Sequence, residues 1–330
     1  MRQKMANTSF FGEDQQQDSP GNGKHAAGCI HERNPMKLTG RTILITGGSA
    51  GIGLAFALKF LELGNRVIVT GRREAVLDEL KGNYPKLQTI QSDVADPAQI
   101  AALARRVKAG YPKLDVLMNN AGIMLHKNLK VPATDLDGLM AEVTINMGGV
   151  IRMTSAFIDI LTANKGTVIN VSSALAFVPL PSAPVYSATK AAVHAYTQSL
   201  RLQLEETGVE VIELMPPAVK TDLSADIAEG DGITLMTTDE LVKQSFASLK
   251  TGALEVRPGQ AKQLALMRRL APISSTSSSG RHLRSWCRSG RPRALRDSGS
   301  ARRGASTACK RDFGDSSTSH KNPFTRGGPK

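Results

Sequence analysis

The sequence predicts an α/β fold in which a doubly wound parallel sheet is flanked by helices on both faces. Short apolar runs rich in Val and Ile alternate with longer amphipathic stretches along most of the chain. The short runs are apolar at most positions, which is typical of strands that helices cover on both faces. Repeated strand–helix units predict parallel pairing, because each helix carries the chain back across the sheet.

The predicted strands are short, and turn-forming residues or amphipathic stretches separate them. In chain order they are Thr42–Thr46, Arg66–Thr70, Thr89–Ser92, Val116–Asn119, Thr167–Val171 and Val209–Leu214. Their alternation with helical patterns places the carboxyl ends of all of them at one edge of the sheet.

The predicted helices have apolar residues at helical spacing. They are Ile52–Leu63, Glu74–Lys81, Pro97–Ala109, Asp135–Leu161, Pro184–Glu206, Thr238–Lys250 and Leu264–Leu270. Asp96 before Pro97 is a favourable N-cap and first-turn pair. Gly64 and Gly208 follow helices, where a left-handed C-cap is common.

Composition divides the chain into three parts. We expect residues 1–35 to be a disordered N-terminal extension, 36–273 to fold as one domain, and 274–330 to be a basic, low-complexity, disordered tail. The formal charge is +13, but residues 36–273 carry only +3 and residues 274–330 carry +10. The excess charge therefore belongs to the tail and says little about the predicted domain.

The cysteines and histidines show no metal-ligand spacing. Cys29, Cys287 and Cys309 all lie outside the predicted domain, which suits a cytoplasmic protein. His126 and His194 each stand alone, which favours pocket-lining or surface positions. No apolar run approaches the roughly 18–20 residues of a membrane span, and the N-terminus does not resemble a signal peptide.

A glycine-rich turn joins the first predicted strand to the first predicted helix. It reads Thr46-Gly47-Gly48-Ser49-Ala50-Gly51-Ile52-Gly53. Glycines at such a turn let the backbone approach a pyrophosphate, and the helix N-terminus offers N–H groups and a positive dipole end. Its place between strand and helix predicts a dinucleotide site.

The end of the second predicted strand bears on the choice of cofactor. Sites that prefer NAD usually place a carboxylate there to bind the ribose 2′-hydroxyl. This chain instead reads Thr70-Gly71-Arg72-Arg73, and a guanidinium can pair with a 2′-phosphate. The sequence therefore favours NADP(H) over NAD(H), although arginines at a helix start can also be simple surface residues.

Tyr186 and Lys190 are spaced to share one face of a predicted helix. A free phenol has a pKa near 10, so it needs help to exchange protons near pH 7. A neighbouring ammonium and the positive charge of an oxidised nicotinamide would both lower that pKa. Tyr and Lys at this spacing are common by chance, but together with the glycine-rich turn the pair indicates a phenol that exchanges protons beside a nicotinamide.

In these motifs the chain resembles the short-chain dehydrogenase/reductase family in its single-domain, Rossmann-type form, over residues 37 to about 271. The phrases at Gly47–Gly53, Ala174–Pro179 and Met215–Val219 look most like the branch named for D-alanine esterification of teichoic acids. The matching motifs are Thr46–Gly53, Asn119–Gly122, a Ser at position 173 that stands 13 residues before Tyr186, the Tyr186/Lys190 pair, and Pro216–Thr221.

The resemblance implies roles for four residues. Ser173, rather than its neighbour Ser172, would hold the substrate oxygen, and Tyr186 would exchange a proton with it. Lys190 would bind the nicotinamide ribose and lower the pKa of the tyrosine. Asn146 would hold a water that links Lys190 to solvent.

The resemblance and the glycine-rich turn together assign a set of cofactor contacts. Besides Tyr186 and Lys190, these are Gly47, Ser49, Gly51, Ile52, Gly53, Arg72, Asp93, Val94, Asn120, Ala121, Gly122, Pro216, Val219 and Thr221.

The resulting functional hypothesis is an NAD(P)(H)-dependent oxidoreductase that needs no metal and interconverts a carbonyl and an alcohol on a small molecule. Apolar residues between 174 and 185 indicate an apolar substrate pocket, and residues 222–237 correspond to a substrate lid. The resemblance implies a homodimer or homotetramer formed through Asp135–Leu161 and Pro184–Glu206. Two alternatives stay open: an NADP-binding sensor without turnover, and a nucleic-acid binder that acts through the tail.

Overall fold

The computed structural model describes residues 35–132, 135–225 and 234–270. The predicted terminal extensions apart from Pro35, the three cysteines, and residues 226–233 of the predicted lid lie outside the described residues. All described residues belong to a single compact unit.

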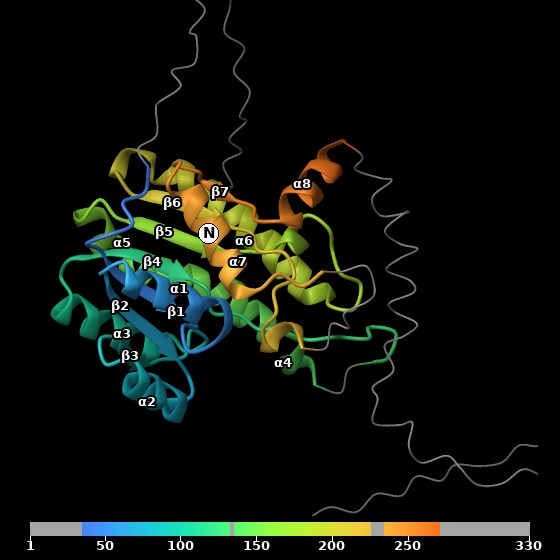
Figure 1. Cartoon of the computed structure of the whole chain (residues 1–330). Helices are drawn as coiled ribbons and strands as arrows, with labels where there is room; N and C mark the ends of the chain where they lie inside the picture. The colour runs from blue at the N-terminus through green and yellow to red at the C-terminus, as the bar shows by residue number, and fades with distance from the viewer. Residues whose placement is uncertain (1–34, 133–134, 226–233, 271–330) are drawn as a thin grey trace, which may run out of the picture. The chain divides into compact units, whose positions relative to one another are not determined.

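The described residues form a seven-stranded sheet in which every neighbouring pair of strands is parallel (Figure 1). The strand order is β3-β2-β1-β4-β5-β6-β7, so the order reverses between β1 and β4. A crevice at such a reversal, at the carboxyl ends of the strands, is where open α/β sheets bind ligands. The strands are β1 (Thr42–Thr46), β2 (Arg66–Gly71), β3 (Gln88–Gln91), β4 (Leu114–Asn119), β5 (Thr167–Val171), β6 (Glu210–Leu214) and β7 (Glu255–Val256).

Helices cover both faces of the sheet, as the apolar strands require. Core residues of α1, α2 and α7 pack on one face, and those of α3, α5 and α6 pack on the other. The longer helices are α1 (Gly51–Glu62), α2 (Glu74–Asn83), α3 (Pro97–Gly110), α5 (Gly149–Ala163), α6 (Pro184–Gln203), α7 (Thr238–Leu249) and α8 (Gln260–Leu270). The short ones are α4 (Leu136–Leu139), a π-helix η1 (Val143–Gly148) and the 3₁₀ turns η2 (Ala174–Ala176), η3 (Glu205–Thr207) and η4 (Asp222–Ser224). The predicted doubly wound fold is thus confirmed.

The predicted caps are found where the sequence placed them. The Asp96 side chain accepts hydrogen bonds from the backbone N–H groups of Ala98 and Gln99, with Pro97 in the first turn. Gly64 and Gly208 have φ values of 79° and 77°, the left-handed conformation that ends a helix.

The prediction of one helix over Asp135–Leu161 is wrong. The chain forms α4, then the π-helix η1, and only then the regular helix α5. Helical periodicity in the sequence does not distinguish an α-helix from a π-helical turn, because one extra residue per turn changes the spacing only locally. The difference matters because Asn146 lies in the π-helical turn.

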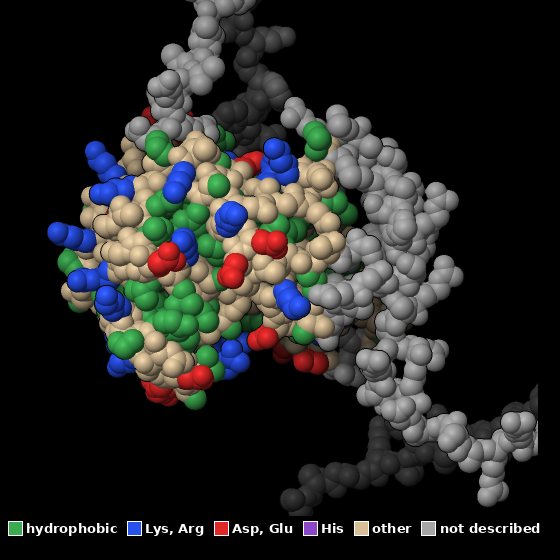
Figure 2. Space-filling model, in the orientation of Figure 1, with side chains coloured by type: hydrophobic (Ala, Val, Ile, Leu, Met, Phe, Trp, Pro, Cys, Tyr) green, Lys and Arg blue, Asp and Glu red, His purple; other side chains and the backbone are tan. Residues whose placement is uncertain are grey.

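Two surface properties of the described residues bear on function. Figure 2 shows side chains of both charge signs on the visible face, in keeping with the small net charge of residues 36–273. Among the described helices, none has the length and apolarity needed to cross a membrane.

Candidate active site

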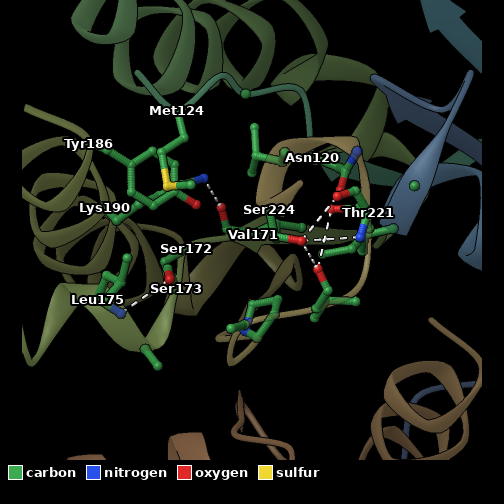
Figure 3. Close-up of a pocket in the computed structure, with 18 of the residues that line it drawn as sticks. Asn120, Met124, Val171, Ser172, Ser173, Leu175, Tyr186, Lys190, Thr221 and Ser224 are labelled. Atoms are coloured by element: carbon green, nitrogen blue, oxygen red, sulfur yellow. Dashed lines mark hydrogen bonds between the residues drawn. The ribbon is translucent and has the colours of Figure 1, made fainter. Parts of the chain in front are cut away.

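A cavity of about 970 Å³ lies among the loops that follow β1, β2, β4, β5 and β6. The glycine-rich turn, the Asn120–Gly122 segment, the serines after β5 and the Pro216–Ser224 segment all line it. Figure 3 shows Tyr186 and Lys190 on one side of this space and Thr221 and Ser224 on the other. The topology therefore gathers motifs that are up to 174 residues apart in sequence, from Gly47 to Thr221, around one space.

The glycine-rich turn packs too tightly for side chains at its first glycines. Gly47 has a φ of 62°, and a Cβ there would stand 2.8 Å from the Cα of Ala121. At Gly48 a Cβ would stand 2.6 Å from the Val69 side chain. These glycines bring the turn against β2 and against the segment after β4.

Thr46 joins the glycine-rich turn to the segment after β4. Its Oγ1 accepts the backbone N–H of Asn120 at 3.0 Å and that of Ala121 at 3.1 Å. In return the Asn120 amide donates to the carbonyls of Thr46 and Gly47, at 3.0 Å each. The two segments thus form one rigid wall of the cavity.

The residues present at this wall fit a dinucleotide. Helix α1 begins at Gly51, and no side chain caps its first turn, so its N–H groups and positive dipole end can meet an anion. Gly47, Ser49, Gly51 and Ile52 line the cavity. A glycine cradle that a Cβ would fill, beside an uncapped helix start, is what close approach of a pyrophosphate requires.

Two arginines line the cavity at the carboxyl end of β2. Arg72 and Arg73 follow Gly71, whose missing side chain leaves room for Ser49; a Cβ there would stand 2.9 Å from the Ser49 hydroxyl. Among the described residues that line the cavity, the one with a carboxylate side chain is Asp222, which lies on the opposite segment, after β6. Of the described residues, those at this end of the cavity therefore offer a ligand cationic groups and no carboxylate.

Tyr186, Lys190 and Ser173 meet at the cavity. Lys190 lies one helical turn after Tyr186 on α6, with its Nζ 5.5 Å from the centroid of the phenol ring. That Nζ donates to the Val171 carbonyl at 2.8 Å (Figure 3). Ser173 caps the turn η2, where its Oγ accepts the Leu175 N–H at 3.1 Å, and its hydroxyl is close enough to the Tyr186 phenol to influence the pKa of that group. All three side chains line the cavity.

Burial dominates the ionisation of the tyrosine–lysine pair. It raises the pKa of the Tyr186 phenol to about 12, with the Ser173 hydroxyl lowering it and the Glu142 charge raising it. Burial also lowers the pKa of Lys190 to about 8, against the opposing effect of Glu213. Desolvation of the phenolate is the largest of these effects, and the lowering of the phenol pKa by Lys190 and an oxidised nicotinamide stays a prediction.

Asn146 is fully buried and its side chain is held on two sides. Its Oδ1 accepts the Ile123 N–H at 2.8 Å, and its Nδ2 donates to the Ile123 carbonyl at 2.9 Å and to the Thr189 hydroxyl at 3.1 Å. A Cβ on Gly122 would stand 3.2 Å from this Oδ1 and 3.7 Å from the Lys190 Nζ. A side chain at residue 122 would thus enter the space between Asn146 and Lys190, which the glycine leaves open.

Four predicted site residues do not line the cavity: Gly53, Asp93, Val94 and Asn146. Gly53 packs its backbone against the Gly47 carbonyl. The Asp93 carboxylate accepts the N–H of Ala95, and Val94 is buried beside α5.

The other half of the cavity is largely apolar. Met124, Leu175, Val178 and Leu180 line it on the side of Tyr186. Helix α8 adds Gln260 and Leu264, and the turn η4 adds Leu223. The sequence pattern identified the apolar residues after Ser173, but it did not indicate that α8 reaches this space. In the part of the chain that the structure describes, no cluster of His, Cys, Asp or Glu could hold a metal ion.

Sequence reasoning missed two buried carboxylates near the site. Glu142 has one oxygen bound to the Leu125 N–H at 2.9 Å and the other without a partner in the described structure. Glu213 contacts Ser172 and His194. A signal for Glu213 existed, because it is a charged residue inside an otherwise apolar strand.

Comparison with known proteins agrees with this arrangement. Residues 41–232 match the family profile described as short chain dehydrogenase. The uncharacterized oxidoreductase DltE of Bacillus subtilis is 42% identical over 224 residues, which are 67% of this chain and 89% of the relative.

Solved structures of short chain dehydrogenases and a related reductase have a similar fold. A short chain dehydrogenase from Burkholderia cenocepacia in complex with NADP superposes with a TM-score of 0.66 at 29% identity, covering 74% of this chain and 98% of that one. The 3-ketoacyl-(acyl-carrier-protein) reductase from Brucella melitensis complexed with NADH gives a TM-score of 0.60 at 27% identity, with coverages of 68% and 100%.

Proposed function

The chain belongs to the short-chain dehydrogenase family of oxidoreductases, and from that premise we propose that it interconverts a carbonyl and an alcohol on an apolar small molecule with NADP(H). The observation that carries the proposal is the meeting of Ser173, Tyr186 and Lys190 at the cavity that the glycine-rich turn lines. A nicotinamide cofactor, when bound, supplies or accepts the hydride.

Each of the three residues has a separate task in this proposal. The Ser173 hydroxyl holds the substrate oxygen by a hydrogen bond. The Tyr186 phenol donates its proton to that oxygen in reduction and takes it back in oxidation. The Lys190 ammonium, already oriented by the Val171 carbonyl, holds the ribose hydroxyls next to the phenol.

Asn146 and Lys190 would return the proton to solvent. The Asn146 Oδ1 accepts a single hydrogen bond in the described structure, from Ile123, and keeps a second lone pair. We assign that lone pair to a water in the space beside Gly122, within reach of the Lys190 Nζ. A side chain at position 122 would occupy the place of this water.

The preference for NADP(H) rests on Arg72 and Arg73. Their place after β2, with no carboxylate at that strand end, suits a 2′-phosphate better than a 2′-hydroxyl. Arg72→Gln should lower the ratio of kcat/KM for NADPH to that for NADH by about tenfold or more. Arg106→Gln, on the exposed side of α3, is the matched control and should leave the ratio unchanged.

The reaction itself is tested by following oxidation of NADPH and NADH against aldehydes, ketones and quinones. Tyr186→Phe should bind NADPH with unchanged affinity and lose turnover by several orders of magnitude, because the phenol is the proton donor. Full turnover in this variant contradicts the assignment.

Two other results would favour the alternative functions. Binding of NADPH by the wild-type chain without turnover of any compound favours the NADP-binding sensor. Salt-dependent nucleic-acid binding that vanishes when residues 274–330 are deleted favours the nucleic-acid binder.

We also propose that the chain self-associates through α5 and α6. Ile151 on α5 and Leu202 on α6 are large apolar side chains that are 37% and 74% exposed. Covering such residues is a common reason for association. Sedimentation velocity of the wild-type chain should give a dimer or tetramer, and a monomer at all concentrations contradicts the proposal.

A further inference from the structure

One fully buried carboxylate has no part in the mechanism above. Glu213 lies in β6 with no exposed surface, and both its oxygens have partners. Its Oε1 accepts the Ser172 hydroxyl at 2.5 Å, and its Oε2 lies 2.8 Å from the Nδ1 of His194. Burying a carboxylate costs free energy unless it is paired and hydrogen bonded. The partners of Glu213 therefore indicate what this buried charge does.

The first partner of Glu213 lies between two elements of the proposed active site. Val171, Ser172 and Ser173 are consecutive: the Val171 carbonyl accepts the Lys190 ammonium, and Ser173 supplies the hydroxyl for the substrate. The backbone of this segment is already tied to β6, since the Ser172 N–H donates to the Leu214 carbonyl at 2.9 Å. Glu213 adds a side-chain bond to the middle residue of the three.

The second partner of Glu213 connects it to the surface. His194 lies one helical turn after Lys190 on α6, and its side chain is 20% exposed. Its Nε2 lies 3.2 Å from the Gln198 Nε2, and its ring meets the edge of Phe177 with the centroids 5.0 Å apart.

Charged groups from two strands and from the segment after β7 face His194. These are Glu213 on β6, Glu255 on β7 and Arg257 just after β7. Together the hydrogen bond and charge of Glu213 and the charge of Glu255 outweigh burial and the charge of Arg257, so the pKa of His194 is raised above its usual value. His194 therefore takes up a proton more readily than a free histidine does, which suits it as a counter-ion for Glu213.

Building on the proposed function, we propose that Glu213 is a positioning residue that fixes Ser173 and Lys190, with His194 as its counter-ion. Through Ser172 it holds the segment on which both the Ser173 hydroxyl and the Val171 carbonyl depend. Its negative charge also favours the protonated form of the buried Lys190, against the effect of burial.

The variant Glu213→Gln separates charge from packing, because the amide has nearly the same shape and can still bond to Ser172. The binding of NADPH, followed by its fluorescence, should weaken as Lys190 loses its proton near pH 8 in the wild-type chain. In Glu213→Gln this weakening should begin about one pH unit lower. The same shift should appear in the alkaline limb of kcat/KM, and kcat should fall about tenfold.

Two further variants complete the test. Glu213→Asp keeps the charge on a shorter side chain, so the alkaline limb should stay in place while kcat falls. Glu210→Gln, in the same strand and away from the cavity, should change neither kcat nor the pH of the alkaline limb of kcat/KM. Should Glu213→Gln fail to fold, the Glu213→Asp result alone decides: unchanged kcat overturns the inference.

The outcomes for this inference and for the proposed function are distinguishable. An alkaline limb that is the same in Glu213→Gln, Glu210→Gln and the wild-type chain overturns the positioning role. A wild-type chain that binds NADPH but turns over no carbonyl compound overturns the proposed function, while the binding titration still tests Glu213.

Discussion

Alanine at Gly47 should damage both the fold and the cofactor site, and three glycines allow the causes to be separated. Gly47 has a φ of 62°, and a Cβ there would stand 2.8 Å from the Ala121 Cα. Gly64 has a φ of 79°, but no atom lies within 4 Å of its Cβ position. Gly82, in α2, has neither a positive φ nor a neighbour within that distance.

The expected changes in the free energy of unfolding follow from these differences. A left-handed conformation costs alanine about 1–2 kcal/mol, so Gly64→Ala should lose that amount. Gly47→Ala adds a clash with backbone, worth about 1–3 kcal/mol, for a total loss of about 2–5 kcal/mol. Gly82→Ala should gain about 0.5–1 kcal/mol, because alanine favours the helix.

Urea unfolding of the three variants measures these free energies, and NADPH titration measures the site. Only Gly47→Ala should lose NADPH affinity, because it moves the Asn120–Gly122 segment away from the glycine-rich turn. If Gly47→Ala matches Gly64→Ala in stability and binds NADPH normally, then close packing at this turn is not what shapes the site.

Two further predictions concern hydrogen bonds and pH. Thr46→Val should lower the free energy of unfolding by about 2 kcal/mol or more, because the backbone N–H groups of Asn120 and Ala121 lose their acceptor. Urea unfolding measures this loss, and an unchanged urea midpoint would mean that water replaces the hydroxyl. The raised pKa of His194 means that the stability from its pair with Glu213 is fully present below pH 6.5 and is lost as the pH rises through the folded-state pKa. Urea midpoints against pH should show this loss in the wild-type chain and not in His194→Gln.

Local patterns predicted the elements that have strong local signals. The strand Thr42–Thr46 and the helix start at Pro97 were placed correctly, because apolar runs and N-caps act within a few residues. The strand β7 was missed, since its two residues, Glu255–Val256, pair only after the rest of the sheet exists. The π-helical turn at Val143–Gly148 was missed because its spacing differs from an α-helix at a single place.

Local sequence patterns were enough to predict the alternation of strands β1 to β6 with the longer helices, the glycine-rich turn between β1 and α1, and the helical spacing of Tyr186 and Lys190. Each depends on residues close together in the chain, whose backbone preferences and periodicity act locally. Only the folded chain brings the Ser172 hydroxyl to Glu213, 41 residues away, and gathers Ser173 and Tyr186 at one cavity. It also decided the pKa directions of Tyr186 and Lys190, because burial and distant charges, which no local pattern contains, control the cost of ionising a side chain.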